Sequence, residues 1–167
     1  MSHSGLYTLL LLGLLSLGSC LPEKSTGTSG DAFTQLFVST EGDDANPGTR
    51  SKPWRTIAKG IESIRPGEML VIRSGTYEEE IDMPTNATET QPIVIRGEGT
   101  TKTIIDLRGR EFQHAVSFAK GASNLTLERI GIKGRYFTRW SHGIFISDVG
   151  ENRRISLRDI KIEWENG

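Results

Sequence analysis

A repeat of 30 residues is the feature that most limits what this chain can fold into. Residues 123–134 (SNLTLERIGIKG) align with residues 153–164 (RRISLRDIKIEW), and the apolar positions of both copies share the spacing L-x-L-x-x-I-x-I, with Ile155 in place of the first leucine. Single-residue alternation indicates a strand with one buried face. The two-residue step in the middle, at 128–129 and 158–159, indicates a bend onto a new face. A shorter match, HAVSF at 114–118 and HGIFI at 142–146, recurs after 28 residues.

Strands this short can bury their apolar face only by stacking on equivalent strands of the next repeat. We therefore predict an all-β fold, a parallel β-helix (solenoid). Period-two apolar pieces bounded by Gly, Asn, Asp or a charge predict the strands, at residues 35–39, 69–72, 92–95, 103–107, 115–118, 125–127, 130–132, 144–146, 155–157 and 160–162. The chain has sixteen isoleucines and only seven alanines, which also favours strands over helices.

One amphipathic helix is predicted before these strands, at residues 53–64. Its apolar residues have helical spacing, namely Trp54, Ile57, Ala58, Ile61 and Ile64. Ser51 can cap this helix and Pro66-Gly67 can end it. We expect it to cover the open apolar end of the first coil. No comparable cap follows the last strand, so we expect the chain to be the N-terminal fragment of a longer protein, a solenoid truncated at its C-terminus.

The first 19 residues predict a signal peptide. Residues 6–17 carry no charge but are too few to span a bilayer, which needs about 20 residues. Leu17-Gly18-Ser19-Cys20 resembles the bacterial lipobox, which would make Cys20 the lipidated first residue and attach the protein to a membrane; an ordinary cleaved signal is the alternative. We expect a flexible tether at 20–33, then the cap and first coils of the β-helix at 34–167. The protein would be exported, as a membrane-anchored lipoprotein or as an extracellular or periplasmic protein.

Charge and cysteine content limit the partners and the redox chemistry. Twenty Lys and Arg against 21 Asp and Glu give a net charge of −1, so no basic excess is available for nucleic acid. Cys20 is the single cysteine, so the mature domain has no internal disulfide. Acidic pairs such as Asp43-Asp44 are interpreted as turn chemistry, and no metal-ligand spacing is present. Glu128, Asp148, Asp159 and Lys161 are expected to be solvated charges.

The loop at residues 134–142 (GRYFTRWSH) is the best candidate for a substrate-binding site, because it combines three aromatic residues with two arginines. Aromatic faces stack on sugars, and arginine forks bind carboxylates bidentately. The candidate substrate-binding residues are Arg135, Tyr136, Arg139, Trp140 and His142. The alternative is that these aromatics cover the side of a coil and that His142, like its equivalent His114, has a packing role. The catalytic residues cannot be assigned from the sequence.

Four stretches, in order, resemble the start of a known family. They are FVSTEGDDANPGT (37–49), KPWRTIAKGIESIRPGEMLVIRSGTYEEEI (52–81), PIVIRGEG (92–99) and TIIDLRG (103–109). The pattern is similar to the N-terminal part of right-handed parallel β-helix proteins of the pectate-lyase-like superfamily, with family 9 polysaccharide lyases and related uncharacterised β-helix repeat proteins closest.

The resemblance implies a carbohydrate-active protein. It implies most directly a polysaccharide lyase that cleaves an acidic, uronate-containing polysaccharide by β-elimination, with Ca²⁺ bound by acidic residues beside a Lys or Arg base in the full-length protein. We expect no cofactor in this fragment, which alone would be inactive. Two alternatives remain: a non-catalytic glycan-binding or envelope β-helix protein, and a β-helix glycoside hydrolase with paired carboxylates. The expected partners are a polysaccharide and, through Cys20, a membrane.

Overall fold

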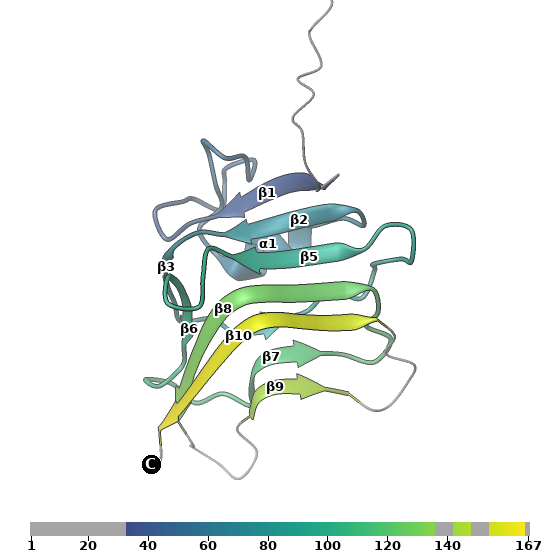
Figure 1. The fold of residues 1–167 in the computed structure, drawn as a ribbon. Helices are drawn as coiled ribbons and strands as arrows, with labels where there is room; N and C mark the ends of the chain where they lie inside the picture. The colour runs from purple at the N-terminus through teal and green to yellow at the C-terminus, as the bar shows by residue number, and fades with distance from the viewer. Residues whose placement is uncertain (1–32, 136–141, 148–153, 166–167) are drawn as a thin grey trace, which may run out of the picture. The chain divides into compact units, whose positions relative to one another are not determined.

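The computed structural model describes residues 33–135, 142–147 and 154–165, which form a parallel β-solenoid of about four turns with one short helix (Figure 1). The predicted fold is confirmed. The elements are β1 (Thr34–Val38), α1 (Ile57–Ser63), β2 (Glu68–Ile72), β3 (Gly75–Tyr77), β4 (Ile81–Asp82), β5 (Ile93–Gly97), β6 (Thr103–Asp106), β7 (His114–Phe118), β8 (Leu125–Arg135), β9 (His142–Ile146) and β10 (Ile155–Glu165). The predicted leader, most of the tether and Cys20 lie outside the described residues. Within them, no helix is long and apolar enough to cross a membrane.

The strands form three faces, and every pair of neighbouring strands is parallel. The first face contains β1, β2, β5 and the first halves of β8 and β10, and the second face contains β3, β6 and the second halves of β8 and β10. The third face contains β4, β7 and β9. Leu125 pairs with Ile155, and His114 with His142, so the register reproduces both sequence repeats.

The bends predicted inside the repeat are present. Each bend lies within one continuous strand, whereas the sequence predicted two separate strands on either side of it. β8 and β10 each have 11 residues. Arg129 and Asp159 turn them onto the second face with φ values of 61° and 48°, in the left-handed region. The repeat therefore encodes the corner between two faces. The short strands β3 and β4 were not predicted, because two or three residues are too few to show a period.

The core lies inside the coils. Four apolar side chains of β8 point inward and are almost fully buried, namely Leu125, Leu127, Ile130 and Ile132. They belong to one hydrophobic cluster that also contains Ile93 and Ile95 of β5 and residues of β7. Successive turns thus stack their apolar residues in register, which is how a solenoid unit buries a face that it cannot bury alone.

The helix is shorter than predicted, because its expected first turn pairs with β1 instead. The Trp54 N–H donates to the carbonyl of Phe37 (3.0 Å), and the Ser39 N–H donates to the carbonyl of Trp54 (2.9 Å). The helix therefore begins after Thr56, whose side chain accepts a hydrogen bond from the Lys59 N–H, and Ser51 is not its cap. α1 packs on β1, β2 and β4, with Ile57 and Ile64 buried, and covers the apolar end of the first turn.

Candidate functional site

The predicted substrate-binding loop joins two faces of the solenoid. Arg135 is the exposed last residue of β8 on the second face, and His142 is the exposed first residue of β9 on the third face. Arg135 lies opposite Glu165 in the register, and His142 lies opposite His114. Tyr136, Arg139 and Trp140, the other predicted site residues, lie outside the described residues.

Beside the end of this loop, the third face carries an aromatic surface formed by His114, His142 and Phe145, which we call the third-face platform. The ring of Phe145 stacks on that of His114, with centroids 4.2 Å apart and planes 10° apart, while the His142 ring centroid is 5.4 Å from that of His114. Phe145 is 39% exposed. A large exposed ring beside two imidazoles is a surface on which a sugar ring can stack.

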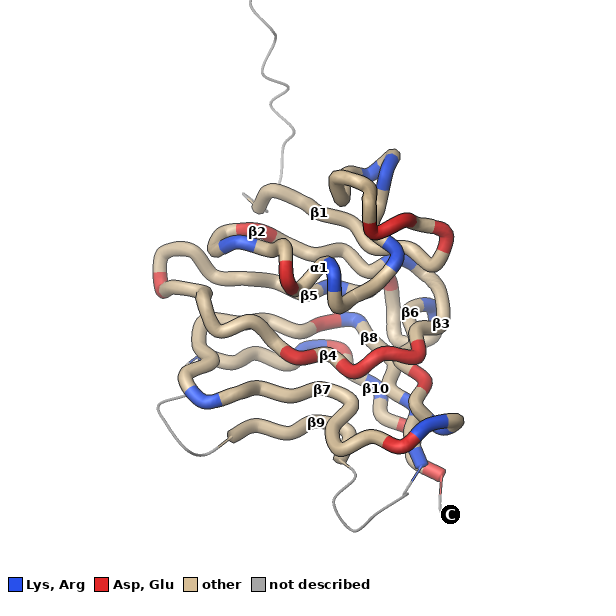
Figure 2. Tube along the Cα trace, turned by 180° about the vertical axis from the view of Figure 1, so that it is seen from behind, with Lys and Arg blue, Asp and Glu red and all other residues tan. Residues whose placement is uncertain are grey.

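Acidic neighbours of the platform lie towards β4. Neither β7 nor β9 contains Lys, Arg, Asp or Glu, whereas acidic residues gather around β4 (Figure 2). Asp82, Ser117 and Phe145 form one row across the face, and the Ser117 hydroxyl donates to Asp82 Oδ1 (2.6 Å).

His114 has a packing role in this surface. Burial, and secondarily the nearby His142, lower the pKa of His114, which favours its neutral form. The stacking on Phe145 supports the packing interpretation for His114.

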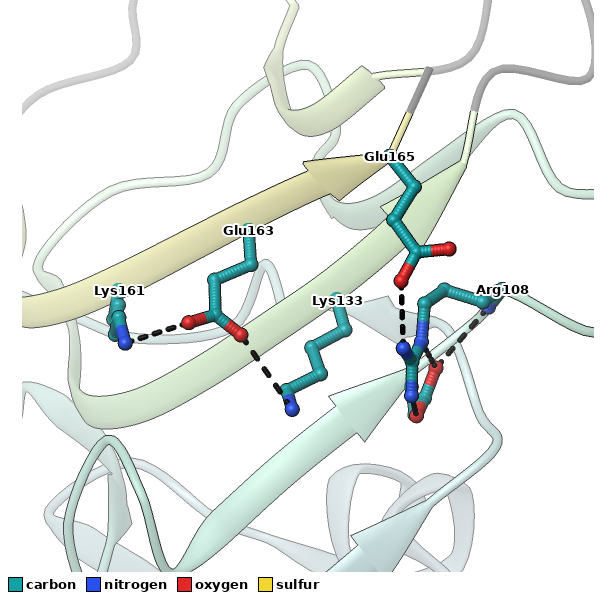
Figure 3. Close-up of polar contacts among 6 residues, drawn as sticks. Arg108, Lys133, Lys161, Glu163 and Glu165 are labelled. Carbon is teal, nitrogen blue, oxygen red and sulfur yellow. Dashed lines mark hydrogen bonds and ion pairs between the residues drawn. The ribbon is translucent and has the colours of Figure 1, made fainter. Parts of the chain in front are cut away.

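The corresponding connection of the previous turn, residues 107–113, shows what this corner of the solenoid does structurally. Arg108 binds Asp106 (2.7 Å). It also reaches Glu165 of β10 (2.7 Å), as Figure 3 shows. Phe112 is buried and meets Trp164 edge-on, with ring centroids 5.6 Å apart. Trp164 lies so close over Gly134 that a Cβ there would be 2.5 Å from the indole. These aromatics are packing residues.

Sequence reasoning missed Phe145 as a site residue and misjudged Glu128. Phe145 lies in an apolar strand, and the sequence pattern therefore predicts that it is a core residue. Glu128 was expected to be solvated, but it is 8% exposed and forms an ion pair with Arg96 (2.5 Å), because the register places Arg96 of β5 directly beside it. Asp159 and Lys161 are exposed, as expected, and Asp148 lies outside the described residues.

The acidic pair Asp43-Asp44 lies in a turn, where both carboxylates accept hydrogen bonds. Asp44 accepts hydrogen bonds from the N–H groups of Arg55 and Thr56 (both 2.9 Å) and from the Thr56 hydroxyl (2.8 Å), which agrees with the turn interpretation. Within residues 33–135, 142–147 and 154–165, no three His, Cys, Asp or Glu side chains form a group that could hold a metal ion. The described residues therefore do not fit a calcium site, and we assign calcium no role in them.

Comparison with known protein families identifies the family of this chain. The model of the Pel9A-like right-handed β-helix region matches residues 36–164. The chain belongs to this family. The Pel9A-like chain is 27% identical over 167 residues to the uncharacterized protein YwoF of Bacillus subtilis (strain 168), and the match covers 92% of this chain and 34% of YwoF. It thus spans about a third of that relative.

Three solved structures share the fold of this Pel9A-like chain. The GH136 lacto-N-biosidase of Eubacterium ramulus is 22% identical, with a TM-score of 0.58, over 77% of this chain and 26% of that one. A rhamnogalacturonan lyase is 20% identical, with a TM-score of 0.57, over 78% and 37% of the two chains. A pectin methylesterase in complex with a hexasaccharide is 13% identical, with a TM-score of 0.53, over 80% and 46%. The likeness concerns the fold, which is related to carbohydrate-active enzymes.

Proposed function

We propose that the protein is an exported carbohydrate-active protein that acts on an acidic polysaccharide as a lyase. The observation that carries the proposal is the third-face platform, where the exposed ring of Phe145 lies beside the end of a loop rich in arginine and aromatic residues. The Pel9A-like family and the names of the neighbours, which include a lyase and an esterase of pectic material, support it.

The platform and the loop supply complementary parts of such a site. A uronate residue has an apolar C–H face, for which Phe145 offers a stacking partner, and a carboxylate, for which Arg135 and Arg139 offer planar guanidinium forks. In β-elimination a base removes the proton from the carbon next to the carboxylate. A double bond then forms between that carbon and its neighbour, the bond from the neighbour to the glycosidic oxygen breaks, and the leaving oxygen is protonated. Phe145 and Arg135 act in substrate binding, and neither is the base.

The test uses the full-length protein and two substitutions at one position. Phe145→Ala removes the ring and its apolar area, and Phe145→Leu keeps most of the area but no aromatic face. We expect both to weaken binding of polygalacturonate oligosaccharides by about two- to twelvefold, as loss of an aromatic contact of roughly 0.5–1.5 kcal/mol implies. Calorimetry measures the affinity, and thermal unfolding of Phe145→Leu checks that the fold is retained.

Activity is measured separately, as the ultraviolet absorbance of the unsaturated uronate product. Product formation that falls in both variants supports the proposed lyase. If the protein binds a series of acidic polysaccharides but forms no product from any of them, it is a non-catalytic glycan-binding protein and not a lyase. Unchanged affinity in both variants would show that Phe145 only packs on His114, and would remove the platform from the site.

A further inference from the structure

We propose that the first face carries a second, anion-binding site that holds the carboxylate or sulfate groups of an acidic polysaccharide. Its centre is an open groove of about 430 Å³, lined by Arg50, Arg96, Lys102, Arg129, Glu98 and Phe37 among others. The inference shares the ligand class of the proposed function, but the groove contains none of the residues of the third-face platform.

The groove gathers residues from four successive turns of the solenoid. Phe37 of β1 pairs in register with Val71 of β2, Val71 pairs with Arg96 of β5, and Arg96 pairs with Glu128 of β8. Arg129 follows at the bend of β8. Neighbouring strands are about 4.8 Å apart, so Arg96 of β5 and Arg129 of β8 lie on adjacent strands a short step apart, and Arg50 and Lys102 line the same groove. A linear polymer with one anionic group on each sugar could therefore contact several of them at once.

Two of the arginines in this region are held in place by an aromatic ring. The guanidinium groups of Arg50 and Arg73 lie 5.7 Å and 5.4 Å from the centroid of Phe37, and Arg73 also donates to the backbone carbonyl of Arg50. Phe37 is only 7% exposed, so its ring supports the cations and is not itself a sugar platform. Contacts of this kind reduce the conformational freedom that an arginine loses on binding a ligand.

The local charge favours an anion. Five cations, Arg73 and the four that line the groove, face two carboxylates in this region. Glu128 is paired with Arg96, and Glu98 accepts hydrogen bonds from the N–H and the hydroxyl of Ser74 (2.9 and 2.6 Å), which together lower the pKa of Glu98. The ion pairs of the described residues do not include the exposed Arg50 or Lys102, although the charge of Lys102 contributes to the lowered pKa of Glu98. Both are therefore available to an incoming anion.

The second face shows the opposite arrangement and provides the control. There Glu163 lies 2.6 Å from Lys161 and 3.5 Å from Lys133, so both lysines already share a carboxylate partner (Figure 3). The cavity that these residues line has about 180 Å³. A polymer that responded only to total charge would not distinguish these two lysines from Arg50 and Lys102.

The experiment compares two double variants of the full-length protein. Arg50→Ala with Lys102→Ala removes two unpaired cations from the groove, and Lys133→Ala with Lys161→Ala removes the same charge from the second face. We measure binding of oligogalacturonate by calorimetry at low and moderate salt, with thermal unfolding to check the fold. We expect about tenfold weaker binding for the groove variant and less than about twofold for the control, and a smaller difference as salt is added.

Equal affinities in the two double variants, whether both unchanged or both reduced, would overturn the proposal. Single-stranded DNA that binds more tightly than oligogalacturonate and loses its affinity in the groove variant would show that the ligand is not a polysaccharide. Phe145→Ala separates the two proposals. If the groove variant weakens binding and Phe145→Ala does not, the groove is supported and the platform is removed from the site. If Phe145→Ala weakens binding and the groove variant does not differ from its control, only the groove proposal is overturned.

Discussion

β8 and β10 have almost the same apolar pattern, yet the structure gives them different surroundings. Leu127 and Ile132 of β8 are fully buried, whereas their register partners in β10, Leu157 and Ile162, are 41% and 48% exposed. β8 lies between β10 on one side and β5 and β6 on the other, and among the described strands β10 pairs with β8 alone (Figure 1). A repeat therefore specifies which side chains point inward, while the stacked turns on both sides decide how far those side chains are buried.

The largest expected effect is a direct test of this difference in the 167-residue chain. Leu127→Ala should lower the free energy of unfolding by about 2–5 kcal/mol, because it leaves a cavity in a packed core. Leu157→Ala removes the same atoms from a side chain that is already 41% exposed, so its cost should be below about 1.5 kcal/mol. Urea unfolding followed by circular dichroism measures both. Equal losses would mean that β10 is buried by a contact that the described residues do not contain.

The second test uses a position at which the two strands carry different residues. Gly131 of β8 pairs with Lys161 of β10. A Cβ at Gly131 would lie 2.2 Å from the carbonyl oxygen of Thr100, so Gly131→Ala should destabilise the protein by about 1–3 kcal/mol through overpacking. Lys161→Ala on the exposed strand should change stability by less than about 0.5 kcal/mol. A tolerated Gly131→Ala would show that the turns can separate locally, and thermal unfolding detects this.

The smallest expected effect compares the two histidines of the third face. The pKa of His114 is lowered in the folded protein, first by burial and then by His142, so its neutral form is favoured on folding. This contribution to stability is fully present above the unfolded value of about 6.5, and protonation removes it as the pH falls below that value. His114→Gln should flatten the pH dependence of stability below pH 6.5.

His142→Gln is the matched control for that measurement. It should remove only the part of the dependence that comes from repulsion between the two rings, which is the second cause of the shift. Thermal unfolding measured between pH 5 and 8 gives both slopes. A steeper slope in His114→Gln than in the parent protein would contradict the assignment.

Much of the fold was predictable because its determinants are local and repeated. The 30-residue and 28-residue matches give the register of β8 with β10 and of β7 with β9. The two-residue step in the pattern gives the corner at Arg129 and Asp159. The same reasoning located the connection between Arg135 and His142, the two ends of the candidate loop. Side-chain alternation and strand length are properties of the chain itself, so one sequence is enough to show them.

The tertiary structure decided the features that depend on contacts between turns. Trp54 has helical spacing in the sequence, but its backbone forms hydrogen bonds at the edge of β1. The helix α1 therefore begins later than the apolar pattern predicts. Glu128 is buried because Arg96, 32 residues earlier, lies beside it. The first-face groove joins Phe37 to Arg129. Successive turns differ in length, so no constant period in the sequence aligns these residues. They meet only because parallel stacking sets strand beside strand, and that arrangement exists only in the folded solenoid.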